Sequence, residues 1–258
     1  MGTPVRVLVI GRGSIAQRHA RNVLALRPDA ELISVGTFSD EIPVRAAVDL
    51  DSALATAPDC VLLCSATSAH IDALPRVIER HLPVYVEKPV VANREELDAV
   101  ESTLASSDYS SATMVGCNLR FLPSLRQVRD IVAAGDIGRV VRAHFEAGQW
   151  LPDWRPGRDY LASYSADASR GGGVVLDLIH ELDAARWLLG DFTRVQADLG
   201  RRSHLGLSSE DVAGILLSSA DGPMATVALD YVSRAPVRRY ALVGDEATLE
   251  WDLSSKTV

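Results

Sequence analysis

The chain has 258 residues, of which 47% are hydrophobic and 23% are charged. These values are typical of a folded globular protein and exclude a disordered or collagen-like polymer, and the length suits two domains of ordinary size. Acidic residues outnumber Lys and Arg by 34 to 26, so the formal net charge of −8 argues against a surface that binds nucleic acid or anionic lipid.

The three cysteines, Cys60, Cys64 and Cys117, form no CxxC pair. Two of them lie in an apolar run, where cysteine behaves as a small hydrophobic residue, so the sequence predicts neither a disulfide framework nor a metal site. The apolar run near the N-terminus is too short for a secretion signal, and no stretch approaches the ~18 apolar residues of a membrane span. We therefore expect a cytoplasmic protein whose partners include neither nucleic acid nor membrane.

Short apolar runs alternate with helical patterns through the first half of the chain, which is typical of βαβ units around a parallel sheet. The expected strands are residues 5–10, 32–35, 60–64, 84–86 and 112–115, and the expected helices are residues 14–26, 52–57, 71–79 and 93–106. Asn93 is the expected N-cap of the last helix. Together these elements predict a doubly wound sheet. Only residues 39–51, with Pro43 among them, separate the second strand from the next helix, so we expect the second crossover helix to be absent or vestigial.

The pattern changes near residue 119. A helix is expected from Pro123, with Gly135 just past its end, and residues 141–147 then alternate apolar and polar side chains, as in a strand with one solvent-exposed face. Further strands are expected at residues 194–199, 212–217, 225–231, 239–243 and 248–251, and one long helix at residues 174–189. The sequence thus predicts an α/β protein with a parallel, doubly wound domain over residues 1–118. An α+β domain with an open-faced, mainly antiparallel sheet follows over residues 119–258.

Residues 11–16 read Gly-Arg-Gly-Ser-Ile-Ala, a GxGxxA motif directly after an apolar strand and directly before a helix. In that position the first glycine makes the tight turn, and the second lets the backbone approach a pyrophosphate. The small last residue lets helix and strand pack closely. The motif alone is compatible with a glycine-rich turn that binds nothing, but its place between strand and helix favours a Rossmann domain that binds a dinucleotide.

The second strand leaves the choice between NAD and NADP open. An acidic residue that binds the ribose hydroxyls is usual about 20 residues after the motif, but Val35 is followed by Gly36, Thr37 and Phe38. Without that carboxylate a 2′-phosphate is not repelled, so NADP is allowed. No arginine adjoins this strand end in the sequence, so NADP is not required either.

Three further stretches carry a family resemblance. The third strand is followed, at residues 65–70, by Ser-Ala-Thr-Ser-Ala-His, and the fourth is followed, at residues 87–89, by Glu-Lys-Pro. Residues 171–183 read Gly-Gly-Gly-Val-Val-Leu-Asp-Leu-Ile-His-Glu-Leu-Asp. With the GxGxxA motif, and with residues 116–121 and 153–156, they resemble the Gfo/Idh/MocA oxidoreductases, named for glucose–fructose oxidoreductase and inositol dehydrogenase. The GGG…IHE variant is most similar to members from surface-polysaccharide and amino-sugar pathways.

The resemblance implies an enzyme that transfers a hydride between NAD(P) and a hydroxyl or carbonyl carbon of a sugar, amino sugar, nucleotide sugar or cyclitol, without a metal. It also implies a homo-oligomer, a dimer or tetramer, formed through the second sheet. Cofactor contacts are expected from Gly11, Gly13, Ser14, Ile15, Thr37, Ser65, Ala66, His70, Glu87, Lys88, Trp154 and Arg155. Substrate contacts are expected from Arg120, Asp159, Tyr160 and His180, and catalysis from Lys88, Asp177 and His180.

Lys88 and His180 are the candidate acid–base groups, because oxidation of a secondary alcohol requires removal of the hydroxyl proton and reduction requires its return. Lys88 follows a parallel strand, at the edge where ligands bind in such sheets, and even when charged it would stabilise a developing alkoxide. The alternatives are ordinary ones: a solvated surface charge for the lysine, and a buried side chain satisfied by a neighbouring acid for the histidine.

The spacing between Asp177 and His180 departs from the family pattern. On one continuous helix Asp177, His180 and Asp183 are spaced i, i+3 and i+6, so one carboxylate could orient the imidazole while the other caps the helix. Many relatives place the acid four residues before the histidine, where this chain has Leu176. This departure puts the role of Asp177 in doubt.

Two other functions stay open on the sequence alone. Relatives commonly continue well past the position of Trp251, so the second domain is expected to be short by its last strands. With the thin second crossover, this is compatible with a member that binds cofactor as a regulator or scaffold without catalysis. The other function is redox-neutral glycoside cleavage, in which bound NAD transiently oxidises the glycoside so that elimination becomes easy.

Overall fold

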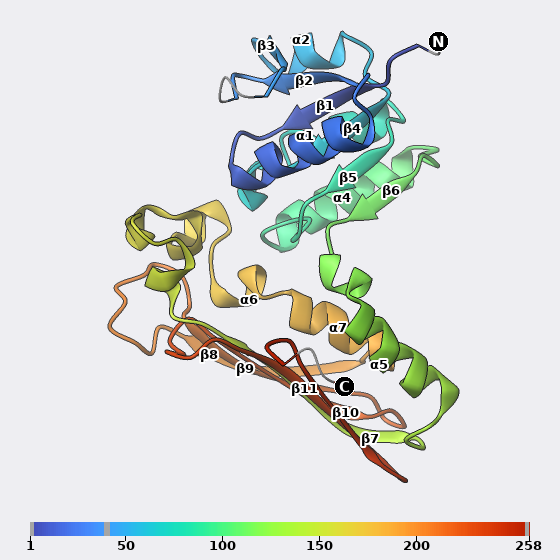
Figure 1. Cartoon of the computed structure of the whole chain (residues 1–258), viewed down its shortest axis with the longest axis vertical. Helices are drawn as coiled ribbons and strands as arrows, with labels where there is room; N and C mark the ends of the chain where they lie inside the picture. The colour runs from blue at the N-terminus through green and yellow to red at the C-terminus, as the bar shows by residue number, and fades with distance from the viewer. Residues whose placement is uncertain (1–2, 39–41, 256–257) are drawn as a thin grey trace. The chain divides into compact units, whose positions relative to one another are not determined.

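The computed structural model describes residues 3–38, 42–255 and 258, and the chain divides into two compact units, Met1–Gly116 and Cys117–Val258. Each unit has its own sheet (Figure 1). Each unit also has its own hydrophobic core. The first sheet is parallel and the second is mainly antiparallel, so the predicted α/β fold class is confirmed.

Six parallel strands form the first sheet in the order β3-β2-β1-β4-β5-β6. Their bounds are β1 (Arg6–Ile10), β2 (Glu31–Val35), β3 (Arg45–Ala47), β4 (Cys60–Leu63), β5 (Val84–Val86) and β6 (Thr113–Val115). The strand order reverses between β1 and β4, and in such sheets ligands bind at the carboxyl ends of the strands beside this point. The loops after β1, β4 and β5 therefore share the edge where a ligand is expected.

Helices pack on both faces of this sheet. They are α1 (Ser14–Leu26), α2 (Leu50–Leu54), α3 (Leu74–Glu79) and α4 (Arg94–Ser106), with the short 3₁₀ helix η1 (Thr67–Ala69) after β4. Val7 and Val9 of β1 are buried in one cluster with Ala16 of α1, while Leu8 and Ile10 are buried in the other. A strand buried on both faces needs apolar residues at successive positions, which is why β1 reads as an unbroken apolar run.

The edge of the sheet beside β2 differs from the prediction, because it carries a strand that the sequence analysis missed. This strand, β3, pairs with β2 but has only three residues, Arg-Ala-Ala, none of them buried. The described residues between β2 and β3 form no helix, and residues 39–41 lie outside the described part of the chain.

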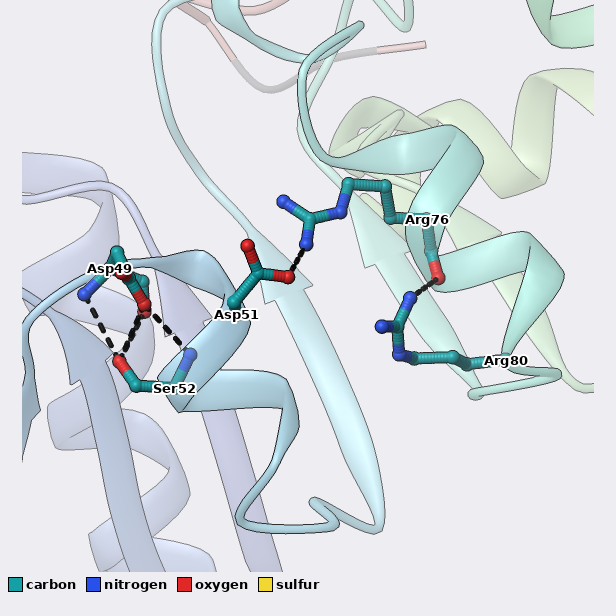
Figure 2. A network of polar contacts seen from close by, with 5 residues as sticks. All are labelled: Asp49, Asp51, Ser52, Arg76 and Arg80. Atoms are coloured by element: carbon teal, nitrogen blue, oxygen red, sulfur yellow. Dashed lines mark hydrogen bonds and ion pairs between the residues drawn. The ribbon is translucent and has the colours of Figure 1, made fainter.

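Helix α2 begins two residues before its predicted start, because Asp49 caps it (Figure 2). The Asp49 carboxylate accepts a hydrogen bond from the Ser52 backbone N–H at 2.7 Å, and the Asp49 backbone N–H donates to the Ser52 hydroxyl at 3.1 Å. Asp51 of the same helix pairs with Arg76 of α3, whose carbonyl accepts a hydrogen bond from Arg80. These contacts stabilise a five-residue helix that is too short to be stable alone.

Six strands form the second sheet in the order β12-β11-β7-β10-β9-β8, and all neighbours are antiparallel except β7 and β10. Their bounds are β7 (Val140–Gly148), β8 (Arg194–Gly200), β9 (Val212–Ser218), β10 (Met224–Asp230), β11 (Val237–Gly244) and β12 (Thr248–Asp252). Ala143, Phe145 and Ala147 of β7 are buried, whereas Arg142 is exposed. The predicted alternation of buried and outward-facing side chains along this strand is confirmed.

Three helices pack against the second sheet. Helix α5 (Pro123–Ala134) contacts β12, α6 (Val174–Asp177) contacts β9 and β10, and α7 (His180–Leu189) contacts β7 and β10. Helix α5 begins at Pro123 and ends at Gly135, which has a φ of +79°, as the sequence predicts.

The prediction of one long helix over residues 174–189 is wrong. Helices α6 and α7 are separated by Leu178 and Ile179. The regular ladder is interrupted at Glu181, whose N–H donates to the carbonyl of Leu178, three residues back instead of four. Asp177 and His180 therefore lie on two different helices.

Candidate active site

The GxGxxA turn lies between β1 and α1 and has the form that a dinucleotide requires. Gly11 has a φ of +117°, and a Cβ placed on it would lie 2.4 Å from the carbonyl oxygen of Cys64, so only glycine fits there. A Cβ on Gly13 would meet nothing within 4 Å, which leaves the backbone open to a ligand. No side chain caps α1 and its first turn has no acidic residue, so the positive end of this helix is available to phosphate groups.

The end of β2 requires a correction, because the structure places an arginine beside it although the sequence does not. Gly36 follows β2 with a φ of +82°, and a Cβ on it would lie 3.1 Å from Cδ and 3.3 Å from Nη1 of Arg12. The guanidinium of Arg12, the second residue of the GxGxxA motif, therefore lies against this strand end. Thr37, the next residue and a predicted cofactor contact, is exposed.

The loop after β4 is held by His70. Its side chain is 1% exposed, with Nε2 3.2 Å from the Ser65 carbonyl oxygen and Nδ1 3.0 Å from the Val90 carbonyl oxygen. Burial lowers the pKa of His70, although the two carbonyls act against the shift, so His70 is neutral near pH 7. The Ser65 hydroxyl is buried and has no hydrogen-bond partner among the described residues. The predicted contacts Ser65 and Ala66 are thus fixed by a structural histidine.

Glu87 and Lys88 follow β5, and both are only partly exposed. Oε1 of Glu87 accepts hydrogen bonds from Nε2 of His19 at 2.7 Å and from the hydroxyl of Tyr85 at 3.0 Å. Burial alone would raise the pKa of Glu87, but these hydrogen bonds and the charge of His19 lower it below its ordinary value. Neither His19 nor Tyr85 was predicted from the sequence. His19 belongs to α1, so Glu87 is tied to the helix that begins at the GxGxxA turn.

In the C-terminal unit, Asp177 at the end of α6 is held by two tyrosines. One carboxylate oxygen accepts a hydrogen bond from Tyr164 and the other from Tyr231, the latter at 2.6 Å. Asp177 is 5% exposed, and burial together with its charge raises the pKa of both tyrosines, so both hydroxyls remain donors. His180 begins α7 and is 9% exposed. Because a helix break separates them, helical spacing alone does not make Asp177 the orienting group of His180.

Arg120, a predicted substrate contact, makes an ion pair within the C-terminal unit. Its Nη2 and Nε donate to the two carboxylate oxygens of Asp183 at 2.5 and 2.9 Å, and its guanidinium lies 5.8 Å from the ring centroid of Trp187. Asp183 therefore pairs with Arg120 and does not cap a helix. A substrate oxygen would have to use the remaining N–H groups of the guanidinium.

A cavity of about 320 Å³ lies in the segment that precedes α6. Its lining is Leu151, Pro152, Trp154, Arg155, Arg158, Asp159, Tyr160, Ala162, Ser163 and Ser165. It thus brings together four residues predicted from the sequence, Trp154, Arg155, Asp159 and Tyr160. The Tyr160 hydroxyl donates to the Leu205 carbonyl at 3.2 Å. The volume is at the lower end of small-molecule pockets, which span about 300–1,000 Å³.

Features of other protein classes do not occur in the described part of the chain. No helix there has both the length and the apolar character needed to cross a membrane. No group of three or more His, Cys, Asp or Glu side chains there could hold a metal ion. All three cysteines are free, and burial raises the pKa of the Cys64 thiol to about 12, so this thiol is unreactive at neutral pH.

Two family models match the chain. Residues 5–112 match the model described as an oxidoreductase family with an NAD-binding Rossmann fold, and residues 125–250 match the C-terminal domain of the same family. The chain belongs to the Gfo/Idh/MocA oxidoreductase family. The resemblance predicted from the motifs is confirmed, and with it an oxidoreductase whose N-terminal unit is an NAD-binding domain.

Several relatives within this family are inositol dehydrogenases. Inositol 2-dehydrogenase of Rhizobium meliloti (strain 1021) is 29% identical over 244 residues, which cover 86% of this chain and 68% of that protein. A myo-inositol dehydrogenase from Corynebacterium glutamicum ATCC 13032 is 26% identical, with a TM-score of 0.78 over 96% of this chain and 75% of that one. An inositol dehydrogenase homolog from Azotobacter vinelandii, solved with NAD+, has a TM-score of 0.81 at 19% identity over 99% of this chain and 72% of that one, which shows the shared fold.

Proposed function

We propose that this chain is an NAD(P)-dependent dehydrogenase that oxidises a ring hydroxyl of a cyclitol or related sugar, or reduces the corresponding ketone. The observation that carries the proposal is the GxGxxA turn, where Gly11 is sterically required, Gly13 is open and α1 is uncapped. The substrate class is supported by the relatives named inositol 2-dehydrogenase, two of which match 86% and 83% of this chain.

The cofactor would lie along the carboxyl edge of the first sheet. Its pyrophosphate would accept hydrogen bonds from backbone N–H groups of Gly13, Ser14 and Ile15, and its nicotinamide end would lie near Ser65 and Ala66. When bound, NAD(P) accepts or returns the hydride. The unused hydroxyl of Ser65 supports this placement, because a buried polar group without a partner is costly unless a ligand satisfies it.

Lys88 would transfer the hydroxyl proton of the substrate. It is one of only two lysines in the chain, although Lys and Arg together number 26. Arginine cannot lose its proton in proteins, whereas lysine can act as a base in suitable surroundings. Lys88 therefore supplies an amine that can exchange a proton, in a chain that uses arginine for nearly all of its other positive charges. His180, in the C-terminal unit, is the second candidate acid–base group of the chain.

The substrate would use the cavity that precedes α6. Asp159 and Tyr160 line it, together with Ser163 and Ser165, and all four side chains can bond to hydroxyl groups. The Asp159 carboxylate already accepts a hydrogen bond from the Leu161 N–H at 2.9 Å, so its position is fixed while its second oxygen can serve a ligand. The cavity thus offers polar groups to the hydroxyls of a ring and an apolar wall to its carbon atoms.

The first test is cofactor binding to the purified protein. Reductive methylation labels any free N-terminus, Lys88 and Lys256, and the Lys88 signal is identified by its loss in Lys88→Arg. NAD or NADP should shift this signal, and the shift is independent of turnover. Lack of binding by both cofactors would contradict the proposal.

The second test is turnover with a panel of inositols and sugars, followed by the absorbance of reduced nicotinamide. Lys88→Ala should lower kcat by about 100- to 10,000-fold, a far larger effect than the one it has on the cofactor Kd. Equal kcat in this variant would exclude proton transfer by Lys88. Glycoside cleavage without net cofactor reduction would identify redox-neutral chemistry instead.

We further propose that the chain forms a homo-oligomer through its second sheet. The edge strand β8 exposes Val195 (66%) and Leu199 (49%), which are paired with the buried Leu217 and Ala213 of β9. An exposed apolar edge strand can pair with or pack against a second copy of the chain. Sedimentation equilibrium should show a dimer or tetramer, and Val195→Lys should weaken it. A monomer throughout the micromolar range would contradict this assembly.

A further inference from the structure

The turn after β2 is fixed by its neighbours and presents Thr37 at the surface. The hydroxyl of the fully buried Ser34 donates to the carbonyl of Gly36 at 2.5 Å. Gly36 has a φ of +82°, in the left-handed region, and Phe38 is buried in the cluster that includes Val9. Thr37 is therefore held at the surface between two anchored residues, and its hydroxyl is available to a ligand.

Arg12 brings a positive charge to this turn. It directly follows Gly11 at the end of β1, and β1 is the neighbour of β2 in the sheet. A Cβ on Gly36 would lie 3.1 Å from Cδ, 3.3 Å from Nη1 and 3.5 Å from Nε of Arg12. The guanidinium thus occupies the space where a larger residue after β2 would place its side chain, so glycine at position 36 makes room for Arg12.

No acidic group accompanies this guanidinium among the described residues. Within them the Arg12 side chain makes no hydrogen bond and no ion pair, and only its backbone carbonyl is used, by Gln17. Residues 32–38 contain no Asp or Glu. The next acidic residues in the sequence, Asp40 and Glu41, lie outside the described residues.

We propose that Arg12 and Thr37 bind the 2′-phosphate of NADP, so that this chain prefers NADP to NAD. The inference rests on the proposed function, because it concerns the adenosine end of the same cofactor. In Rossmann domains an acidic residue after the second strand binds the ribose hydroxyls of NAD, whereas a nearby arginine accommodates the 2′-phosphate of NADP. This chain has glycine and threonine in place of the acid. A guanidinium can donate two hydrogen bonds to one phosphate, and the threonine hydroxyl can add a third.

The experiment compares the binding of NADPH and NADH to the purified full chain by nicotinamide fluorescence, without turnover. NADPH should bind at least about tenfold more tightly than NADH, and Arg12→Ala should weaken NADPH by about 10- to 100-fold while NADH changes little. Arg18→Ala is the matched control, because Arg18 is an exposed arginine of α1 farther from the turn. This control removes the same charge and should leave the preference intact.

Two further measurements locate the effect. The fragment 2′,5′-ADP should bind more tightly than 5′-ADP and lose this advantage in Arg12→Ala, and Thr37→Asp should reverse the preference toward NADH. Equal or tighter binding of NADH by the unmodified chain would overturn the inference. Equal losses of NADPH affinity in Arg12→Ala and Arg18→Ala would also overturn it. Loss of NADH binding in Asp40→Asn would overturn it too, because Asp40 would then be the acidic residue that binds the ribose of NAD. If neither cofactor binds, the proposed function itself is contradicted, whereas binding of NADH in preference to NADPH contradicts only this inference.

Discussion

At the scale of single residues, the candidate site depends on a missing side chain at Gly11. Gly11→Ala would place a Cβ 2.4 Å from the Cys64 carbonyl oxygen and 2.7 Å from the Ser65 N, at a φ of +117°. The backbone of two neighbouring loops must then shift, so we expect loss of cofactor binding and a lower free energy of unfolding, by about 1–3 kcal/mol. Thermal unfolding and cofactor titration measure both effects.

Gly135→Ala is the control for this prediction, because Gly135 has a φ of +79° but a Cβ there would meet nothing within 4 Å. This substitution tests backbone strain without the clash. Equal destabilisation by the two substitutions would show that the clash with the loop after β4 has no effect.

Glu87 makes a second residue-scale prediction, which depends on pH. Its pKa in the folded chain lies below the ordinary value, so its bonds to His19 and Tyr85 contribute stability at neutral pH that is lost as the pH falls through the folded pKa. Glu87→Gln should lower the free energy of unfolding at pH 7 by about 1–3 kcal/mol, and the difference from the parent chain should shrink below about pH 4.

Urea unfolding followed by far-UV circular dichroism at several pH values measures this difference. Tyr85→Phe is the matched control, since it removes a hydrogen bond from the same carboxylate oxygen without removing a charge. The free energy of unfolding lost in this variant should vary less with pH. If the loss of unfolding free energy in Glu87→Gln stays constant from pH 7 to low pH, the stabilising group is not the ionised carboxylate.

At the scale of elements, those with local signals were predicted well. Helix α1 begins and ends at the predicted residues, Asn93 caps α4 through its side chain, and Gly135 ends α5. Each depends on a cap, a turn residue or an apolar run that lies within a few positions of the element. Strand β3 was missed because its three residues have no apolar run and are defined only by pairing with β2.

The break between α6 and α7 could not be predicted, because residues 174–189 contain no glycine or proline that would end a helix. Contacts from distant parts of the chain occur at the break, where Asp177 binds Tyr164 and Tyr231. The same reasoning applies to the candidate site. The GxGxxA glycines and Lys88 lie in local motifs, whereas no spacing rule joins His19 to residue 87.

The Asp177 contacts make an element-scale prediction. In Asp177→Asn the side chain keeps its size, but one of its two acceptor oxygens becomes a donor, so one buried tyrosine hydroxyl loses its partner. We expect the free energy of unfolding to fall by about 1–3 kcal/mol. Trp fluorescence is a suitable readout, because the Trp154 ring lies 5.3 Å from that of Tyr231. Tyr231→Phe should lower the free energy of unfolding by less in a chain that already carries Asp177→Asn than it does alone. Additive losses would contradict a hydrogen bond between Tyr231 and Asp177.

At the scale of the whole molecule, the two units can be observed separately. All four tryptophans, Trp150, Trp154, Trp187 and Trp251, belong to the unit Cys117–Val258. Tryptophan fluorescence therefore reports unfolding of the C-terminal unit, while far-UV circular dichroism reports both units. This separation allows the effect of a buried charge in one core to be measured without interference from the other.

Glu181 is that buried charge. It is fully buried, with Oε1 2.8 Å from Nε of Arg238, and it accepts a hydrogen bond from Tyr240 at 3.1 Å. Burial raises the pKa of Glu181, although Arg238 and Tyr240 act against the shift. A raised folded pKa means that the contribution of Glu181 to stability is greatest below its unfolded pKa and falls as the pH rises through the folded one.

Arg238→Met should therefore destabilise the C-terminal unit by about 3–5 kcal/mol at neutral pH, because the carboxylate loses its compensating charge. The loss should shrink as the pH is lowered toward about 4, where Glu181 takes up a proton in the folded and unfolded chain alike. The double variant with Glu181→Gln should recover most of the loss at neutral pH, since a neutral amide needs no counterion. Urea titrations followed by Trp fluorescence measure all three effects. A loss that is independent of pH, or that the double variant does not recover, would mean that Arg238 contributes through packing and not through its charge.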